Sequence, residues 1–167
     1  MSSSNDQYRR PNLSSIYASR PIPILSLSLK LAHLLQFSPQ AEVRAMSAVL
    51  LRKQLTRDDS YLWPRLNPSS QFSLKSILLS CIQSEDSKSI SKKLCDTVSE
   101  LASGILPDNG WPEWLPFMFQ CVSSDSLKLQ ESAFLIFAQL SHSTGDTLVP
   151  HIKHLHGVFL QCLTSAS

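Results

Sequence analysis

The sequence lacks the short motifs that many enzymes carry. Only four of its 167 residues are glycine, and they form no glycine-rich phosphate-binding loop. A Gly-x-Ser-x-Gly elbow and a His-Glu-x-x-His helix are also missing. The adjacent carboxylates of Asp58 and Asp59 point in different directions and suit a solvated turn after a helix. We therefore expect no catalytic residues, no bound cofactor and no enzymatic activity.

Charged residues and long apolar runs are scarce as well. Charged residues make up 17% of the chain and the net charge is +2, whereas about 25% is typical. Because a nucleic-acid-binding protein usually carries a strongly basic face, we expect no direct contact with nucleic acid. No apolar run reaches the roughly 18 residues that span a bilayer, since Lys30 and His33 interrupt the best candidate, residues 22–35. We expect no membrane contact.

Cysteine and histidine are present but form no metal-binding pattern. The four cysteines lie far apart, and three fall on apolar helix stripes, which predicts buried thiols in a reducing compartment. His151 and His154 would share a helix face, but a zinc site needs a third ligand, and none lies at a suitable spacing. We therefore expect no bound metal.

What the chain does contain is a helical pattern that occurs three times. The copies begin at Val43, Ile90 and Leu129, so their starts are 47 and 39 residues apart (90 − 43 and 129 − 90). In each copy an apolar residue leads, a polar one follows, and an apolar or small residue comes four places after the leader. Such a period is typical of stacked HEAT or armadillo hairpins, which cannot bury their apolar faces alone. The sequence predicts an all-α solenoid of this kind.

Helix-start signals divide the array into about three hairpins and one unpaired helix. Ser38-Pro39 and Asn67-Pro68 each place a capping residue before a proline, which is tolerated in a first helical turn. The array is expected over residues 26–167. Its hairpins cover about 26–55, 68–105 and 111–140, and the last helix covers about 147–164.

Apolar residues that recur at the helical period are expected to face the core. In the first hairpin these are Leu27, Leu31, Leu34 and Leu35, then Val43, Met46, Leu50 and either Gln54 or Leu55. Later stripes run through residues 74–82, 90–105, 111–122 and 129–140. The three tryptophans beside prolines suit the seams between repeats, and an aromatic ligand groove is the alternative; they are Trp63, Trp111 and Trp114.

The two ends of the chain differ from this pattern. Residues 1–25 are rich in Ser, Pro and Arg, contain one acidic residue, and show no helical period. This predicts a disordered tail, and an organelle transit peptide is the alternative for an acid-poor, Ser- and Arg-rich leader. At the other end, the unpaired last helix leaves an apolar face uncovered, whereas repeat arrays normally close with a polar cap. The uncovered face predicts either a truncated chain or self-association.

Three segments carry a resemblance to a known family. Residues 41–66, AEVRAMSAVLLRKQLTRDDSYLWPRL, strongly resemble the second-repeat region of importin-beta-type nuclear transport receptors. Residues 89–122, SISKKLCDTVSELASGILPDNGWPEWLPFMFQCV, resemble the next repeats, and LQESAFLIFAQL and HIKHLHGVFLQCL continue the match. The resemblance runs from about Ser26 to the C-terminus and is strongest to the beta-3 class of importins in its plant form.

This resemblance implies a HEAT solenoid whose second helices line a concave face. In such receptors the N-terminal repeats bind the small GTPase Ran in its GTP form, which releases cargo. By position, the concave helices here would be residues 42–55, 87–103 and 126–140. Polar residues on these helices that miss the buried stripes are the candidates for partner binding: Arg44, Arg52, Lys53, Lys92, Lys93, Asp96, Glu100, Lys128 and Glu131.

The resemblance also implies a function and a location. It implies a non-catalytic fragment of a nuclear transport receptor, which acts in protein import through Ran-GTP and import cargo, in the cytoplasm and nucleus. The family's first repeat and its cargo-embracing C-terminal arch have no counterpart in the sequence, which indicates truncation. The alternative is a HEAT-repeat structural adaptor that no longer binds Ran or cargo, and that competes with a full-length receptor for nucleoporins.

Overall fold

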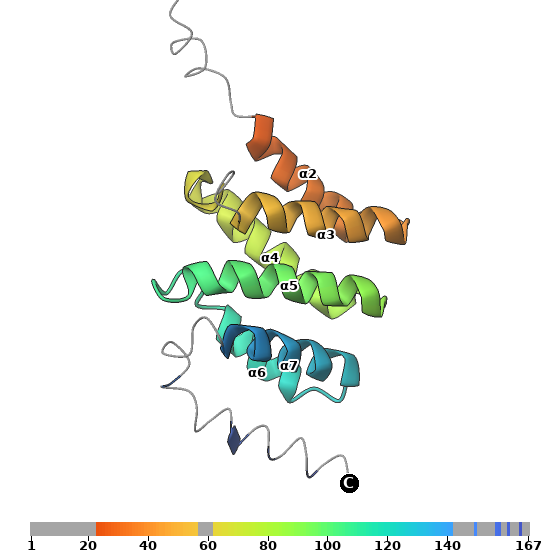
Figure 1. The fold of residues 1–167 in the computed structure, drawn as a ribbon, viewed down its shortest axis with the longest axis vertical. Helices are drawn as coiled ribbons and strands as arrows, with labels where there is room; N and C mark the ends of the chain where they lie inside the picture. The colour runs from red at the N-terminus through yellow and green to blue at the C-terminus, as the bar shows by residue number, and fades with distance from the viewer. Residues whose placement is uncertain are drawn as a thin grey trace, which may run out of the picture.

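The computed structural model describes residues 23–56 and 62–141, together with Val149, His156, Gly157, Leu160 and Thr164. Over the two continuous stretches the chain forms six α-helices, one short 3-10 helix and no strand (Figure 1). This confirms the predicted all-α class. The elements are α2 (Pro23–Phe37), α3 (Ala41–Thr56), η2 (Trp63–Arg65), α4 (Pro68–Ser84), α5 (Lys88–Ile105), α6 (Trp114–Val122) and α7 (Leu127–Ser141).

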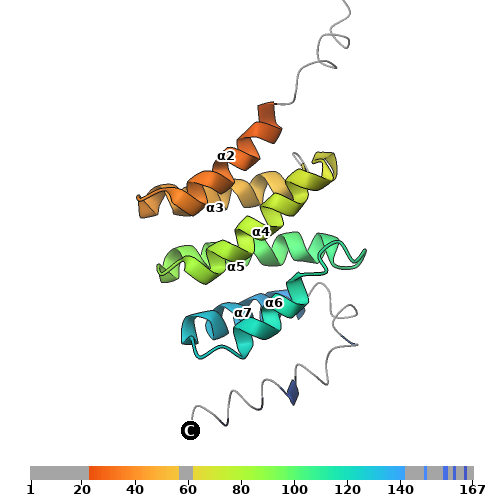
Figure 2. The same cartoon turned by 180° about the vertical axis from the view of Figure 1, so that it is seen from behind.

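The helices form two layers. Figure 1 shows α3, α5 and α7 side by side at the front, and Figure 2, the view from behind, shows α2, α4 and α6 in front of them. Within the first layer α3 packs against α5, and α5 packs against α7. Each hairpin thus contributes its first helix to one layer and its second helix to the other, as a solenoid requires.

One apolar core runs through the stack from Leu31 in α2 to Leu140 in α7. The predicted stripe of α5 is confirmed, since all of its members are buried. Trp63, Trp111 and Trp114 are buried as well, and the indole of Trp114 packs edge-on against Phe137 of α7 with ring centroids 5.6 Å apart. The tryptophans therefore fill the core between hairpins and do not line a groove. None of the described helices is long and apolar enough to span a membrane.

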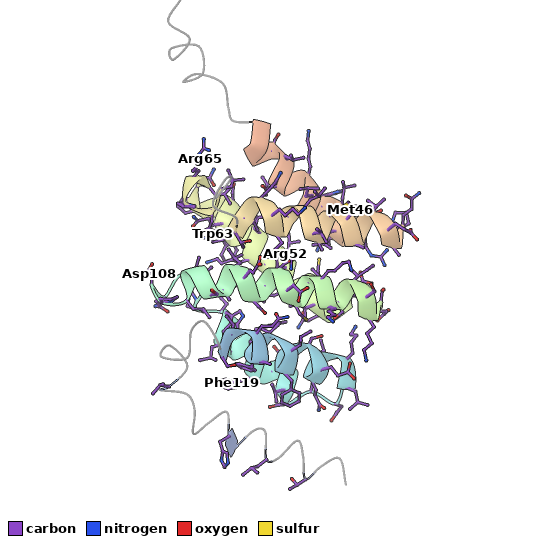
Figure 3. All side chains as sticks on the ribbon, viewed as in Figure 1. Met46, Arg52, Trp63, Arg65, Asp108 and Phe119 are labelled. Atoms are coloured by element: carbon purple, nitrogen blue, oxygen red, sulfur yellow. The ribbon has the colours of Figure 1, made fainter. Side chains whose placement is uncertain are left out.

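The predicted stripe of α3 is wrong for its central residues. Met46 is 58% exposed and Leu50 is 39% exposed, and Figure 3 labels Met46 at the edge of α3 away from α5. The hydroxyl of Thr97 on α5 lies 3.3 Å from the carbonyl oxygen of Ala48, so small residues are needed where the two helices meet. The buried face instead consists of Ser47, Ala48, Leu51 and Leu55.

The stripe of α2 is only partly right. Leu31 and Leu35 are buried as predicted, but Leu27 and Leu34 are each 43% exposed. Small residues are buried instead, since Ser28 is fully inside and its hydroxyl donates to Oε1 of Gln54 on α3, 2.9 Å away. In α2, as in α3, small residues lie on the face that packs against the adjacent helix.

Most helix boundaries lie close to their predicted positions. Asn67 caps α4, because its side-chain oxygen accepts a 2.8 Å hydrogen bond from the backbone N–H of Ser70. α2 begins at Pro23 rather than at residue 26, and α3 begins at Ala41, after Ser38-Pro39. α6 begins at Trp114 rather than at residue 111. Residues 1–22 and most of the predicted last helix, 147–164, lie outside the described residues.

The buried cysteines lead to a testable prediction. Cys81, Cys95 and Cys121 are buried free thiols, as the sequence predicts, and Cys162 lies outside the described residues. Burial raises the pKa of each of the three thiols from 9.0 to about 11, and only a thiolate is a good nucleophile. At pH 8 we expect an aromatic disulfide reagent to modify Cys81, Cys95 and Cys121 slowly in the native chain and rapidly in denaturant. Rapid native modification of more than one thiol would contradict this burial.

Candidate partner-binding surface

The nine candidate residues all lie on the three helices of one layer, which we call the α3/α5/α7 layer. The second helices of successive hairpins lie side by side in this layer, and the role of the nine residues in partner binding stays a prediction. The nine side chains differ in whether they already form ion pairs or hydrogen bonds within the chain. α3 carries Arg44, Arg52 and Lys53, α5 carries Lys92, Lys93, Asp96 and Glu100, and α7 carries Lys128 and Glu131.

Arg44 is held in a clamp between two hairpins. Its Nε lies 2.8 Å from Oε2 of Glu85, and its Nη2 lies 3.1 Å from Oε1 of the same carboxylate, which sits in the α4–α5 loop. Such bidentate, charge-assisted pairs are strong and directional. Nη1 of Arg44 also donates to the carbonyl oxygen of Ser38 in the α2–α3 loop, 2.9 Å away. The guanidinium therefore joins both loops to α3.

Glu85 is nearly enclosed, with 7% of its side chain exposed. Burial on its own raises the pKa of this carboxyl. The hydrogen bonds from Arg44 and from the backbone N–H of Ser87, 3.0 Å away, favour the charged form and outweigh burial, so the pKa lies below its ordinary value of 4.5. A carboxylate with these partners remains ionised at neutral pH and holds the clamp closed.

A second network crosses the centre of the layer. Figure 3 places Arg52 between α3 and α5, where its Nη1 lies 3.5 Å from Oδ2 of Asp96 and its Nε lies 3.7 Å from Oε2 of Glu100. Thr56 donates to Glu100 at 2.8 Å, and the amide of Gln139 on α7 donates to Oδ1 of Asp96 at 2.7 Å. The three charged side chains remain partly exposed, so a partner can still reach them.

The ion pairs at the far end of the layer are more open. Nζ of Lys128 lies 3.2 Å from Oδ1 of Asp86, and Nζ of Lys88 lies 3.1 Å from Oε2 of Glu131. The Lys88 and Glu131 side chains are 89% and 63% exposed. Exposed pairs of this kind typically contribute under about 1 kcal/mol, so a partner can displace them at little cost.

Lys92 and Lys93 lie on α5, the middle helix of the layer. Lys92 is exposed and Lys93 is half-buried, and neither pairs with a carboxylate within the part of the chain that the structure describes. Lys53 is exposed on α3. Arg57, which would extend this basic group, lies outside the described residues.

Sequence reasoning missed several residues that complete the layer. The signal for them lies in the repeat itself, because each of these residues contacts a partner 41 to 44 positions away, about one repeat length. Aligning adjacent repeats at that offset would have brought each missed residue beside its partner. The missed residues are Thr56, Glu85, Asp86, Lys88 and Gln139.

The described residues contain no group of three or more His, Cys, Asp or Glu that could hold a metal ion. His151 and His154, the pair weighed as zinc ligands, lie outside them. What the layer does offer is a row of charged groups on three parallel helices, and that arrangement suits binding to another protein.

Comparison with known proteins supports the same conclusion. A family model described as "IPO5-like, TPR repeats" matches residues 73–167, more than half of the chain. The chain belongs to the importin-beta family of nuclear transport receptors. Receptors of this family are not enzymes, and importin homologues shuttle between cytoplasm and nucleus.

Curated members of the importin-beta family are much longer than this chain. A probable importin-5 homolog of Dictyostelium discoideum is 28% identical over 121 residues, which are 71% of this chain and 11% of that protein. Importin-4 of Mus musculus is 26% identical over 137 residues, which are 80% of this chain and 12% of that protein. The chain therefore spans only about a tenth of the length of these relatives.

Solved structures of a karyopherin have the same fold. Kap121p bound to the extreme C-terminus of the protein phosphatase Cdc14p matches with a TM-score of 0.62 and 28% identity, over 76% of this chain and 12% of that one. Kap121p bound to Nup53p matches with a TM-score of 0.63 over 87% of this chain and 14% of that one; at 24% identity it shows the fold alone. These matches confirm the HEAT-repeat solenoid. Membership of the plant beta-3 class is not tested by them and stays a prediction.

Proposed function

We propose that this chain is a fragment of an importin-beta-type receptor and that it acts in protein import into the nucleus. In this proposal it binds Ran-GTP and import cargo through the α3/α5/α7 layer and performs no catalysis. The observation that carries the proposal is the alignment of the three second helices, with their nine charged candidates, in a family member. Lys92 and Lys93 are the first contacts we propose, because the fold gives them no carboxylate partner among the described residues.

Cargo and nucleoporins are the further partners we propose. The support is by likeness, since Kap121p has been crystallised with a segment of Cdc14p and with Nup53p. We also propose that the chain occupies the cytoplasm and the nucleus, as importin homologues do. Self-association through the C-terminal repeat stays a prediction, because that repeat falls largely outside the described residues.

The contacts between hairpins favour a second candidate function. Six of the nine candidates form ion pairs with a residue of another helix or loop. They are Arg44, Arg52, Asp96, Glu100, Lys128 and Glu131. A layer engaged in this way suits a HEAT-repeat structural adaptor that binds neither Ran nor cargo. The two functions differ in whether the chain distinguishes the nucleotide state of Ran.

A pull-down separates the two candidates. The full chain is immobilised and offered Ran loaded with GTP or with GDP at matched concentration. Retention of the GTP form alone is the result we expect from a transport receptor fragment. Equal retention of both forms, or of neither, would remove that function and leave the adaptor.

A further inference from the structure

The turn between α5 and α6 contains an Asn-Gly pair, Asn109-Gly110. Figure 3 labels the preceding residue, Asp108, at the end of α5, and Asn109 is exposed there. In such a pair the backbone nitrogen of the glycine can attack the side-chain amide of the asparagine, because glycine has no Cβ to hinder the approach. The turn therefore holds the chemical groups for a spontaneous modification.

The modification is a deamidation, and water is its only co-reactant. The backbone nitrogen of Gly110 loses its proton and bonds to Cγ of Asn109, while the side-chain amide nitrogen leaves as ammonia. Water then opens the resulting succinimide ring at one of its two C–N bonds. Breaking the bond to Cγ gives aspartate. Breaking the original peptide bond gives isoaspartate, in which the main chain runs through Cγ and is one carbon longer.

The geometry of the turn requires both residue types. Asn109 has a φ of 54°, in the left-handed region that asparagine adopts more readily than most residues. A Cβ at position 110 would lie 2.7 Å from the carbonyl oxygen of Ile105, which is too close for any residue other than glycine. The shape of the turn thus selects the pair that permits the reaction.

The same turn also restrains the attacking nitrogen. The N–H of Gly110 donates to the carbonyl oxygen of Ile105, 2.8 Å away, so this hydrogen bond must break before the nitrogen can attack. The carbonyl oxygen of Gly110 accepts a hydrogen bond from Nζ of Lys75 on α4, 2.9 Å away. Because both bonds fix Gly110 to its neighbours, a local opening of the turn has to precede the reaction.

The effect of the reaction depends on the residue that the turn positions. Trp111 follows Gly110 directly, is 1% exposed and belongs to the apolar core. A longer main chain at position 109 would displace Gly110, so its two hydrogen bonds and the burial of Trp111 would no longer fit together. We propose that Asn109 is a site of spontaneous deamidation, that the closed α5–α6 turn limits its rate, and that the isoaspartyl product loosens Trp111 from the core.

Mass spectrometry of the full chain tests the site and the restraint. The chain is incubated at neutral pH and 37 °C, in buffer and in guanidinium chloride. We expect Asn109 to deamidate at least about tenfold more slowly in buffer, because only the open turn reacts. Asn67 is an internal control, since Pro68 has no N–H with which to attack it. Equal rates at Asn109 in both solutions, or no reaction in denaturant, would overturn the proposal.

Two lysine variants test whether the turn controls the rate. Lys75→Met removes the hydrogen bond to Gly110 and should raise the rate in buffer several-fold. Lys128→Met removes a comparable bond to the carbonyl oxygen of Gln83, elsewhere in the stack, and should not. Hydrogen exchange of the Gly110 N–H measures the same closure without a substitution. Exchange at the rate of an unfolded chain, or equal deamidation in both variants, would show that the turn does not limit the reaction.

The product is tested separately from the rate. Deamidated chains carry one more negative charge and are isolated by ion exchange, and an isoaspartate-specific methyltransferase identifies the isoaspartyl form. We expect that form to show red-shifted tryptophan fluorescence and a lower thermal midpoint than the unmodified chain. Freshly purified Asn109→Asp has the same charge on an unaltered main chain and should resemble the unmodified chain. Isoaspartyl chains that match Asn109→Asp in both measurements would contradict the loosening of Trp111.

Discussion

Replacing Leu51 with alanine is expected to lower the free energy of unfolding by about 2–5 kcal/mol, the range for a leucine removed from a packed core. Leu51 is fully buried in α3, on the face that packs into the stack. The cavity left behind would lie between helices whose backbones already approach closely, since Thr97 of α5 contacts the carbonyl of Ala48. The surrounding helices can therefore move only partly into the cavity, and the loss of stability should be large.

The neighbouring leucine provides a matched control. Leu50 is 39% exposed, so Leu50→Ala should cost less than about 1 kcal/mol. Both variants remove the same atoms from adjacent positions of one helix, and urea unfolding followed by circular dichroism measures both losses. Equal losses, or a larger loss at Leu50, would mean that α3 is rotated from its position in the structure and would restore the stripe read from the sequence.

The second large effect is expected at the Arg44–Glu85 clamp. Glu85→Gln keeps the shape of the side chain but removes the charge that receives the bidentate pair, and hydrogen bonds to charged groups contribute about 1.5–3 kcal/mol each. We expect a loss of about 1–3 kcal/mol at pH 7, because the amide of glutamine can still accept one bond. Arg44→Met should be more damaging, since it leaves the carboxylate of Glu85 enclosed without its partner.

The pH dependence of this effect follows from the direction of the pKa shift. The folded-state pKa of Glu85 lies below its ordinary value of 4.5, so its stabilisation is present above that value and is lost as the pH falls through the folded pKa. The difference in unfolding free energy between the unmodified chain and Glu85→Gln should therefore be large at pH 7 and shrink toward pH 3. Glu113→Gln, an exposed carboxylate, should show no such change. A difference that is constant from pH 7 to pH 3 would contradict the clamp.

The helix stripes that could be read from the sequence are those whose buried face is made of large apolar residues. In α5, Ile90, Leu94, Val98, Leu101 and Ile105 recur at the helical period, and all of them are buried. In α3 the residues from 46 to 51 are nearly all apolar or small. The helical period alone is therefore consistent with either of two buried faces, one through Met46 and Leu50 and one through Ser47 and Leu51. The close contact with α5 decides between these faces, and it favours small side chains over large ones.

The candidate surface could be predicted at the level of helices but not of individual contacts. The family resemblance selected the second helix of each hairpin, and the structure places those helices in one layer. Whether a charged residue is free or paired depends on how adjacent hairpins are rotated against one another. Arg44 and Lys92 look alike in the sequence, yet Arg44 closes a clamp on Glu85 while Lys92 has no carboxylate partner among the described residues.

The most direct measurement is the affinity of the full chain for Ran-GTP, compared between two charge reversals. Lys92→Glu with Lys93→Glu alters the α3/α5/α7 layer, and Lys30→Glu alters an exposed position on α2 in the opposite layer. We predict GTP-dependent binding that weakens on the order of tenfold in the double variant and stays unchanged in Lys30→Glu. Binding that does not depend on the nucleotide, or that falls equally in both variants, would contradict a partner-binding α3/α5/α7 layer.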